Sequence, residues 1–211
     1  MADFDWGVTG VLAVAVFFLA WYYAAFVYSR RLARRVATEL KDAVLSLGGT
    51  SNVRWFGTTA FRMTTEEANP PFQQVSVTVT LRPREMPINW AVGTAQRRRD
   101  AALIEASLRA NPRVAFELID PSTRIGRRRT RAKSDWVTLS LDSREFLLSA
   151  EDDTAARHLI ERLGAETFKP IMALNVTAGS ESGIATSVSV EPGDAGRGLA
   201  AIRSLAERLV G

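Results

Sequence analysis

The sequence predicts an α+β protein, with a single N-terminal transmembrane helix followed by a two-layer domain in which helices pack on a mainly antiparallel sheet. Three observations lead to this prediction. Residues 6–29 form a run of 24 residues without a charge. Residues 73–81 alternate strictly between apolar and polar side chains, as a strand with one buried face does. Residues 30–47 and 195–210 each carry one apolar stripe at helical spacing.

The uncharged run is long enough to cross a membrane. A helix rises about 1.5 Å per residue, so about 20 apolar residues span a hydrocarbon core of roughly 30 Å. A buried core helix is the alternative, but such runs are usually shorter. A cleaved signal peptide would carry its basic residues before the run, whereas here they follow it. Aromatic residues suited to the headgroup level lie toward both ends, at Trp6, Trp21, Tyr22, Tyr23 and Tyr28.

The charges that flank this run predict its orientation. Asp3 and Asp5 precede it, and four arginines follow it at once, namely Arg30, Arg31, Arg34 and Arg35. By the positive-inside rule we expect the N-terminus outside the cell and the remainder in the cytoplasm. The chain then divides into an N-terminal tail and transmembrane helix (1–29), a juxtamembrane amphipathic helix (30–49) and a cytoplasmic α+β domain (50–211).

The juxtamembrane helix is expected to continue the membrane helix as one rod of about 40 residues, on the order of 60 Å long. Gly48 and Gly49 come directly after its last apolar position and predict its end. Two short strands follow, at 53–56 and 60–63. The strand at 73–81 is the clearest in the chain, and its strict alternation favours an antiparallel sheet.

The second half of the domain mixes predicted helices and strands. Residues 91–109 are expected to form a helix that Asn111-Pro112 stops. Residues 149–152 have the form of a capping box that opens a helix ending at Gly164. The other expected elements are a strand at 113–119, a turn at 120–123, a basic loop at 124–133, a hairpin from 136–141 and 145–148, a helical piece at 166–172, strands at 174–178 and 184–190, and a helix at 195–210.

The composition is that of a globular domain. Hydrophobic residues make up 46% of the chain and charged residues 24%, which does not fit a disordered tail. The basic pI of about 9.9 suggests nucleic acid, yet half of the net charge of +4 comes from residues 1–35, which hold four arginines and two aspartates. The chain has no cysteine, and this excludes disulfides, thiolate nucleophiles and cysteine-ligated metals.

Two basic clusters are candidates for binding an anionic surface. Clustered arginines neutralise phosphates on RNA or on anionic lipid headgroups. No aromatic residues for base stacking lie within the longer cluster, and no RNA-binding motif is present. A solvated loop, lipid headgroups, and RNA or an acidic protein surface stay open as alternatives. The clusters consist of Arg97, Arg98 and Arg99, and of Arg124, Arg127, Arg128, Arg129, Arg131 and Lys133.

The sequence predicts no catalytic residue, metal or cofactor. His158 is the only histidine, and a metal site there would need several carboxylates to gather around it. Residues 193–198 stand where a phosphate loop would, but match neither nucleotide-binding fingerprint, so we interpret them as a tight turn. Asp152 and Asp153 are explained by helix capping.

The leading functional prediction is a membrane-anchored protein-interaction or scaffold subunit without catalytic activity. Its expected partners are the lipid bilayer and either another protein or a second copy. The alternative is binding of anionic lipid or RNA through the clusters at 97–99 and 124–133, with nucleic acid less favoured. An enzyme comes third, built from scattered carboxylates such as Glu117, Asp120, Asp135 and Glu145.

Overall fold

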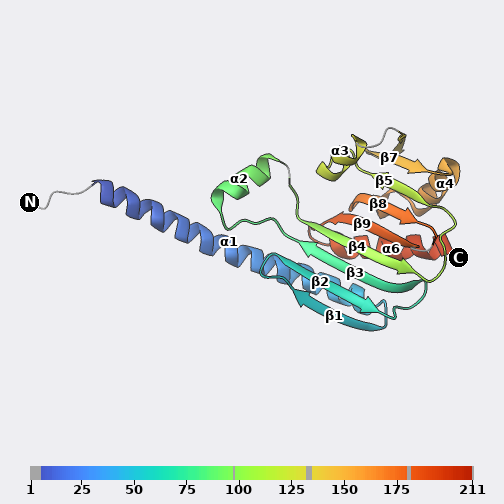
Figure 1. The fold of residues 1–211 in the computed structure, drawn as a ribbon, viewed down its shortest axis with the longest axis horizontal. Helices are drawn as coiled ribbons and strands as arrows, with labels where there is room; N and C mark the ends of the chain where they lie inside the picture. The colour runs from blue at the N-terminus through green and yellow to red at the C-terminus, as the bar shows by residue number, and fades with distance from the viewer. Residues whose placement is uncertain (1–5, 97, 132–134, 180–181, 211) are drawn as a thin grey trace, which may run out of the picture.

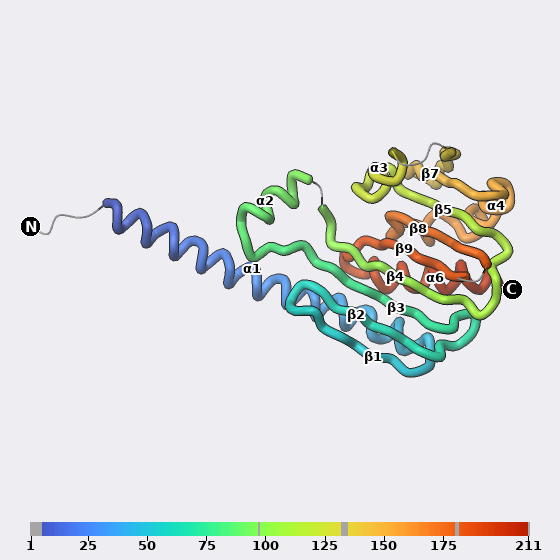
Figure 2. The backbone as a smooth tube through the Cα atoms, in the orientation of Figure 1, coloured from blue at the N-terminus to red at the C-terminus, as the bar shows by residue number. Residues whose placement is uncertain are grey.

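The computed structural model describes residues 6–96, 98–131, 135–179 and 182–210. A nine-stranded antiparallel sheet forms its centre, in the order β1-β2-β3-β4-β9-β8-β5-β7-β6. Helices pack against this sheet, and one long helix projects from it (Figures 1 and 2). The predicted α+β class and antiparallel sheet are confirmed. The strands are β1 (Thr50–Trp55), β2 (Ala60–Glu66), β3 (Phe72–Thr80), β4 (Ala101–Leu108), β5 (Phe116–Ile119), β6 (Val137–Leu141), β7 (Arg144–Ala150), β8 (Ile171–Thr177) and β9 (Gly183–Ser189). The helices are α1 (Trp6–Leu45), α2 (Pro87–Ala95), α3 (Arg124–Thr130), α4 (Asp153–Leu163), α5 (Ala165–Phe168) and α6 (Asp194–Val210).

The predicted rod is confirmed, because α1 runs unbroken through 40 residues. Its second half packs on the domain beside α6 and β2, burying the predicted stripe at Val36, Leu40 and Val44. Its first half projects away from the sheet (Figure 1). Among the described residues α1 is the one helix long and apolar enough to cross a membrane, and none of its most apolar 18-residue stretch is buried.

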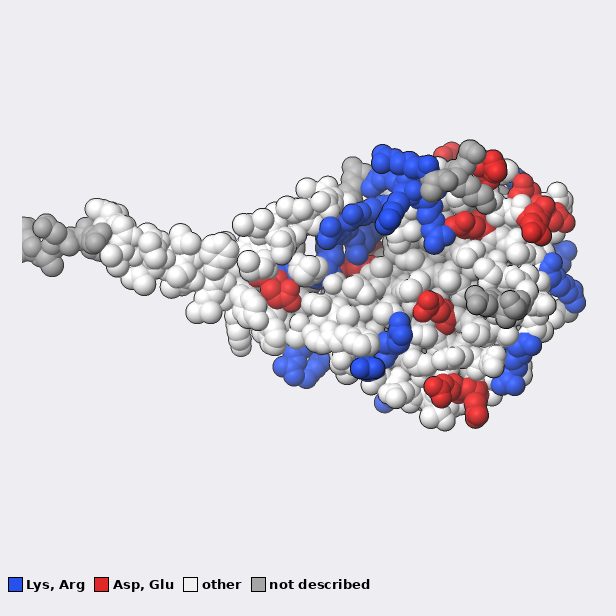
Figure 3. All heavy atoms as spheres, in the orientation of Figure 1, with Lys and Arg blue, Asp and Glu red and all other residues white. Residues whose placement is uncertain are grey.

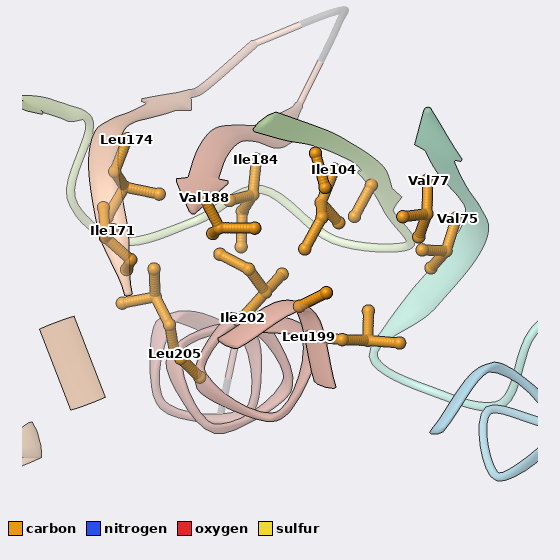
Figure 4. Close-up of a cluster of buried hydrophobic side chains, with 14 of the residues drawn as sticks. Val75, Val77, Ile104, Ile171, Leu174, Ile184, Val188, Leu199, Ile202 and Leu205 are labelled. Atoms are coloured by element: carbon orange, nitrogen blue, oxygen red, sulfur yellow. The ribbon is translucent and has the colours of Figure 1, made fainter. Parts of the chain in front are cut away.

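The core lies between the sheet and α6. Figure 4 shows Ile104, Ile184 and Val188 on the sheet facing Leu199, Ile202 and Leu205 of α6, and all six side chains are buried. A Cβ added at Gly198 would lie 2.8 Å from Val188 Cγ1. Glycine at this position therefore allows α6 to approach β9 closely. The predicted stripe of the last helix is confirmed by this packing.

The helix predicted at 91–109 is wrong. The structure divides this stretch into the short α2 and the strand β4. In β4 the residues Ala102, Ile104, Ala106 and Leu108 are buried while those between them are mostly exposed, a spacing of two rather than three and four. Alanine, leucine and glutamate favour helices, but β4 lies between β3 and β9, and this central place in the sheet overrides local propensity.

The basic loop predicted at 124–133 is also wrong, because residues 124–130 form α3. Thr123 caps this helix by accepting a hydrogen bond from the Gly126 amide at 3.0 Å. Threonine is a common N-cap residue, because its side-chain oxygen accepts a hydrogen bond from an unpaired amide of the first turn. The sequence predicts a turn at 120–123, so this helix start is not recognised from it. Lys133 lies outside the described residues.

Two predicted details near α4 and α5 need correction. The cap of α4 is Asp152, whose side chain accepts from the Ala155 amide at 2.9 Å, whereas Ser149 belongs to β7. The helical piece predicted at 166–172 is the single turn α5, which ends at Phe168. Pro170 follows α5 and Ile171 opens β8, because proline cannot continue a helix with a full set of hydrogen bonds.

Candidate functional site

A cavity of about 360 Å³ lies at the end of the sheet where β3 leaves it and β4 enters it. The start of α3 and Met172 of β8 close its other sides. Four arginines from three separate segments line it, and we call this cavity the arginine basin. They are Arg82 after β3, Arg98 and Arg99 before β4, and Arg124 at the start of α3. Figure 3 shows a dense group of basic side chains on the same side of the domain, over α3.

The basin joins the two clusters predicted from the sequence. The side-chain oxygen Oε1 of Gln96 accepts from Arg98 Nε at 3.0 Å and from Arg124 Nη1 at 3.4 Å. Gln96 therefore connects one guanidinium from each cluster through a neutral acceptor. None of the described residues lining the basin is an aspartate or glutamate. Asp100, which lies outside this lining, is 3.7 Å from Arg82 Nε.

One carboxylate beside the basin contacts both Arg82, which lines the basin, and the neighbouring Arg84. Asp100 accepts from the Arg82 backbone amide at 2.7 Å and from Arg84 Nη2 at 2.5 Å. Arg82 Nε is buried and lies 3.7 Å from Asp100 Oδ1, too far for a hydrogen bond. Asp100 thus fixes the place of the Arg82 backbone but leaves its guanidinium incompletely paired.

Asp120 stabilises the turn that leads into α3 at the edge of the basin. One of its oxygens accepts from the Ser122 amide at 2.8 Å, and the other pairs with Arg144. Burial alone would raise the pKa of Asp120, but the hydrogen bonds from Ser122 and the positive charge of Arg144 together lower it below its usual value. The carboxylate is therefore held in its charged form, which positions Ser122 and Thr123 at the edge of the basin.

None of the other predicted cationic residues that the structure describes lines the basin. Arg127, Arg128 and Arg131 are exposed on or next to α3, and Arg129 is paired with Glu117. Arg97 is not among the described residues. Arg30, Arg31, Arg34 and Arg35 are exposed on α1, and Arg35 pairs with Glu39 at 3.1 Å.

Sequence reasoning missed Arg82. It lies between Leu81 and Pro83, shortly after β3 and outside both predicted clusters. The only signal was its position directly after the clearest strand, where a side chain lies at the end of the sheet.

The described residues contain no group of three or more carboxylate or histidine side chains that could hold a metal. His158 is exposed, with Glu161 3.9 Å away. Of the four scattered carboxylates, Glu117 pairs with Arg129 and Asp120 with Arg144.

The turn predicted at 193–198 contacts α1, because the amide of Gly193 donates to the Glu39 carboxylate at 3.1 Å.

The arrangement is therefore suited to binding an anion. Guanidinium groups match phosphate geometry and hold it through paired hydrogen bonds. The described part of the basin wall offers no carboxylate or imidazole for proton transfer. No family model matches this sequence, and no curated protein resembles it significantly.

Proposed function

We propose that this chain is a single-pass membrane-anchored domain that binds the phosphate groups of anionic lipid headgroups in the arginine basin. The observation that carries the proposal is the convergence of four arginines from three separate segments, Arg124 being the one from the second cluster, on a cavity whose described lining holds no carboxylate. This favours anionic-lipid binding, the alternative predicted from the sequence, over the scaffold. The basin is also linked to α2, because the backbone amide of Arg98 donates a hydrogen bond to the Gly93 carbonyl oxygen of that helix at 2.9 Å.

In this proposal residues 6–29 of α1 cross the bilayer and the domain lies on the cytoplasmic side. The support is the unburied apolar half of α1 followed by Arg30, Arg31, Arg34 and Arg35, which the positive-inside rule places in the cytoplasm. We expect protease added outside intact cells to leave the domain intact, and protease added after permeabilisation to digest it. Digestion of the domain in intact cells would contradict this orientation.

The basin proposal predicts a large loss of anion affinity when its arginines are neutralised. We expect Arg98→Ser, Arg99→Ser and Arg124→Ser together to weaken binding roughly 100-fold, since each basic residue near anionic lipid contributes about 1 kcal/mol. The measurement uses the full chain in phosphatidylcholine nanodiscs, titrated with a short-chain phosphatidylglycerol and, separately, with inorganic phosphate. Binding of both probes indicates a phosphate site, and preference for the lipid indicates a headgroup site.

The matched control removes three exposed arginines elsewhere, with Arg162→Ser, Arg203→Ser and Arg208→Ser on α4 and α6. It lowers the net charge equally but leaves the basin intact, so we expect the affinity to stay unchanged. An equal loss of affinity in both variants would show that binding depends on the net charge rather than on the basin, and would contradict the proposal. Tighter binding of RNA or of an acidic polypeptide than of lipid would instead assign the basin to one of the alternative partners.

A further inference from the structure

The helix α2 exposes an unusual amount of apolar surface. Its nine residues, 87–95, include no charged side chain, and only Gly93 is buried. Ile88, Trp90 and Val92 are exposed by 67%, 39% and 47%, and Met86, the preceding residue, by 53%. Folded domains rarely leave a contiguous group of large apolar side chains in water without a partner.

The position of α2 is fixed against the apolar half of α1. The rings of Trp90 and Trp21 meet edge to face, with centroids 5.5 Å apart. Trp21 Nε1 also donates to the Arg84 carbonyl oxygen at 3.0 Å, which secures the segment leading into α2. Figure 1 shows α2 apart from the sheet and beside the projecting part of α1. The helix therefore lies at the level of the uncharged run, not at the level of the domain core.

The charged residues close to α2 in the chain include Arg84 and the half-buried Glu85 before it, and Arg98 and Arg99 after it. Trp21 precedes Arg30, the first charge after the uncharged run, by nine residues, or about 13 Å of helix. The Arg84 guanidinium is buried between the Tyr28 ring, 5.3 Å away, and Asp100, so it adds no bare charge at this level. Arg98 and Arg99, beyond the other end of α2, line the arginine basin.

We propose that α2 is a second membrane contact. Its exposed apolar side chains lie in the interfacial layer of the cytoplasmic leaflet, where α1 emerges from the bilayer toward the domain. This inference rests on the proposed membrane anchoring. The occupant is the bilayer rather than a protein, because Trp90 of α2 packs on Trp21 within the uncharged run of α1. An interfacial helix buries its apolar face about 5–10 Å into the boundary between headgroups and acyl chains. Such a contact holds the domain against the surface and presents the arginine basin to the headgroups.

The absence of cysteine from the chain allows single spin labels to test this inference. The full chain is reconstituted into phosphatidylcholine–phosphatidylglycerol liposomes with a label at Ile88→Cys or Val92→Cys. Collision with oxygen, which concentrates in lipid, is compared with collision with a water-soluble nickel chelate. Phe17→Cys in the projecting half of α1 is the lipid reference, and Ser204→Cys on the exposed face of α6 is the water reference.

We expect the oxygen-to-nickel ratio at 88 and 92 to exceed that at 204 several-fold and to approach that at 17. Ratios at 88 and 92 equal to that at 204, with 17 in lipid, would overturn the inference while leaving the anchor intact. A ratio at 17 equal to that at 204 would overturn the anchoring itself. The two failures are therefore distinguishable within one set of samples.

Discussion

Replacing Gly126 with alanine is expected to destabilise the domain strongly, although the substitution adds one methyl group to a helix. A Cβ at this position would lie 2.0 Å from the Asp120 carbonyl oxygen and 2.7 Å from its carbonyl carbon. Both are backbone atoms, and Asp120 is itself held by Ser122 and Arg144. Because these backbone atoms cannot shift without breaking the contacts of Asp120, we expect α3 to move away from the end of β5.

Overpacking of this kind costs about 1–3 kcal/mol, and the close approach to backbone places Gly126→Ala at the upper end. For a protein of this size about 3 kcal/mol corresponds to a fall in Tm of roughly 10 °C. Thermal unfolding of the full chain in detergent, followed by near-ultraviolet circular dichroism, measures it. Because α3 carries Arg124, the affinity of the arginine basin should fall as well.

Gly196→Ala is the control for this prediction. Gly196 also lies in a helix, α6, but the nearest atom to an added Cβ is Glu39 O at 3.9 Å, an ordinary contact. We expect Tm to be unchanged or raised, since alanine favours a helix by up to about 1 kcal/mol over glycine. A Gly126→Ala variant as stable as Gly196→Ala would show that α3 does not pack on Asp120 as described.

Replacing Leu40 with alanine is expected to have the second large effect. Leu40 lies on the domain half of α1 and is 0% exposed, whereas Leu45 on the same half is 55% exposed. Truncating a fully buried leucine costs about 2–5 kcal/mol, because it loses the transfer free energy and leaves a cavity. Leu45→Ala should change the free energy of unfolding by no more than about 0.5 kcal/mol.

The same thermal unfolding experiment compares the two leucine variants. A Tm lower by at least roughly 5 °C for Leu40→Ala, with Leu45→Ala near the wild type, is the expected result. It would establish that the second half of α1 is part of the folded core rather than a free stalk. Equal Tm values for the two variants would contradict the packing of α1 beside α6 and β2.

The elements that the sequence predicted correctly have one apolar face and clear boundaries. In α6 and in the second half of α1 the stripe recurs every three or four residues, and in β3 it recurs every two. Gly48 and Gly49 mark the end of α1 with positive φ angles of 72° and 73°, a conformation that glycine adopts readily. Periodicity and glycine are local signals, so these elements needed no knowledge of the sheet.

The failures occurred where tertiary contacts decide the structure. The strand β4 consists largely of helix-favouring residues, and its place between β3 and β9 determines its conformation. The arginine clusters could be identified in the sequence, but their convergence depends on the order in which β3, β4 and β8 lie in the sheet. The contribution of Arg82 to the basin and the placement of α2 beside α1 could not be inferred, because each depends on a neighbour distant in the chain.

The edge strand β1 has a further consequence if α1 anchors the chain in a bilayer as proposed. Trp55 on this strand is 47% exposed, and the unpaired outer side of an edge strand can join a strand of another molecule. The turn at Gly48 and Gly49 sends β1 back along α1 in the opposite direction (Figure 1). Antiparallel joining of two such edges would therefore point their anchors in opposite directions, which two copies inserted the same way in one membrane cannot do. In the proposed membrane-anchored state, insertion would therefore prevent antiparallel joining of these edges, and extraction by detergent would remove that restraint.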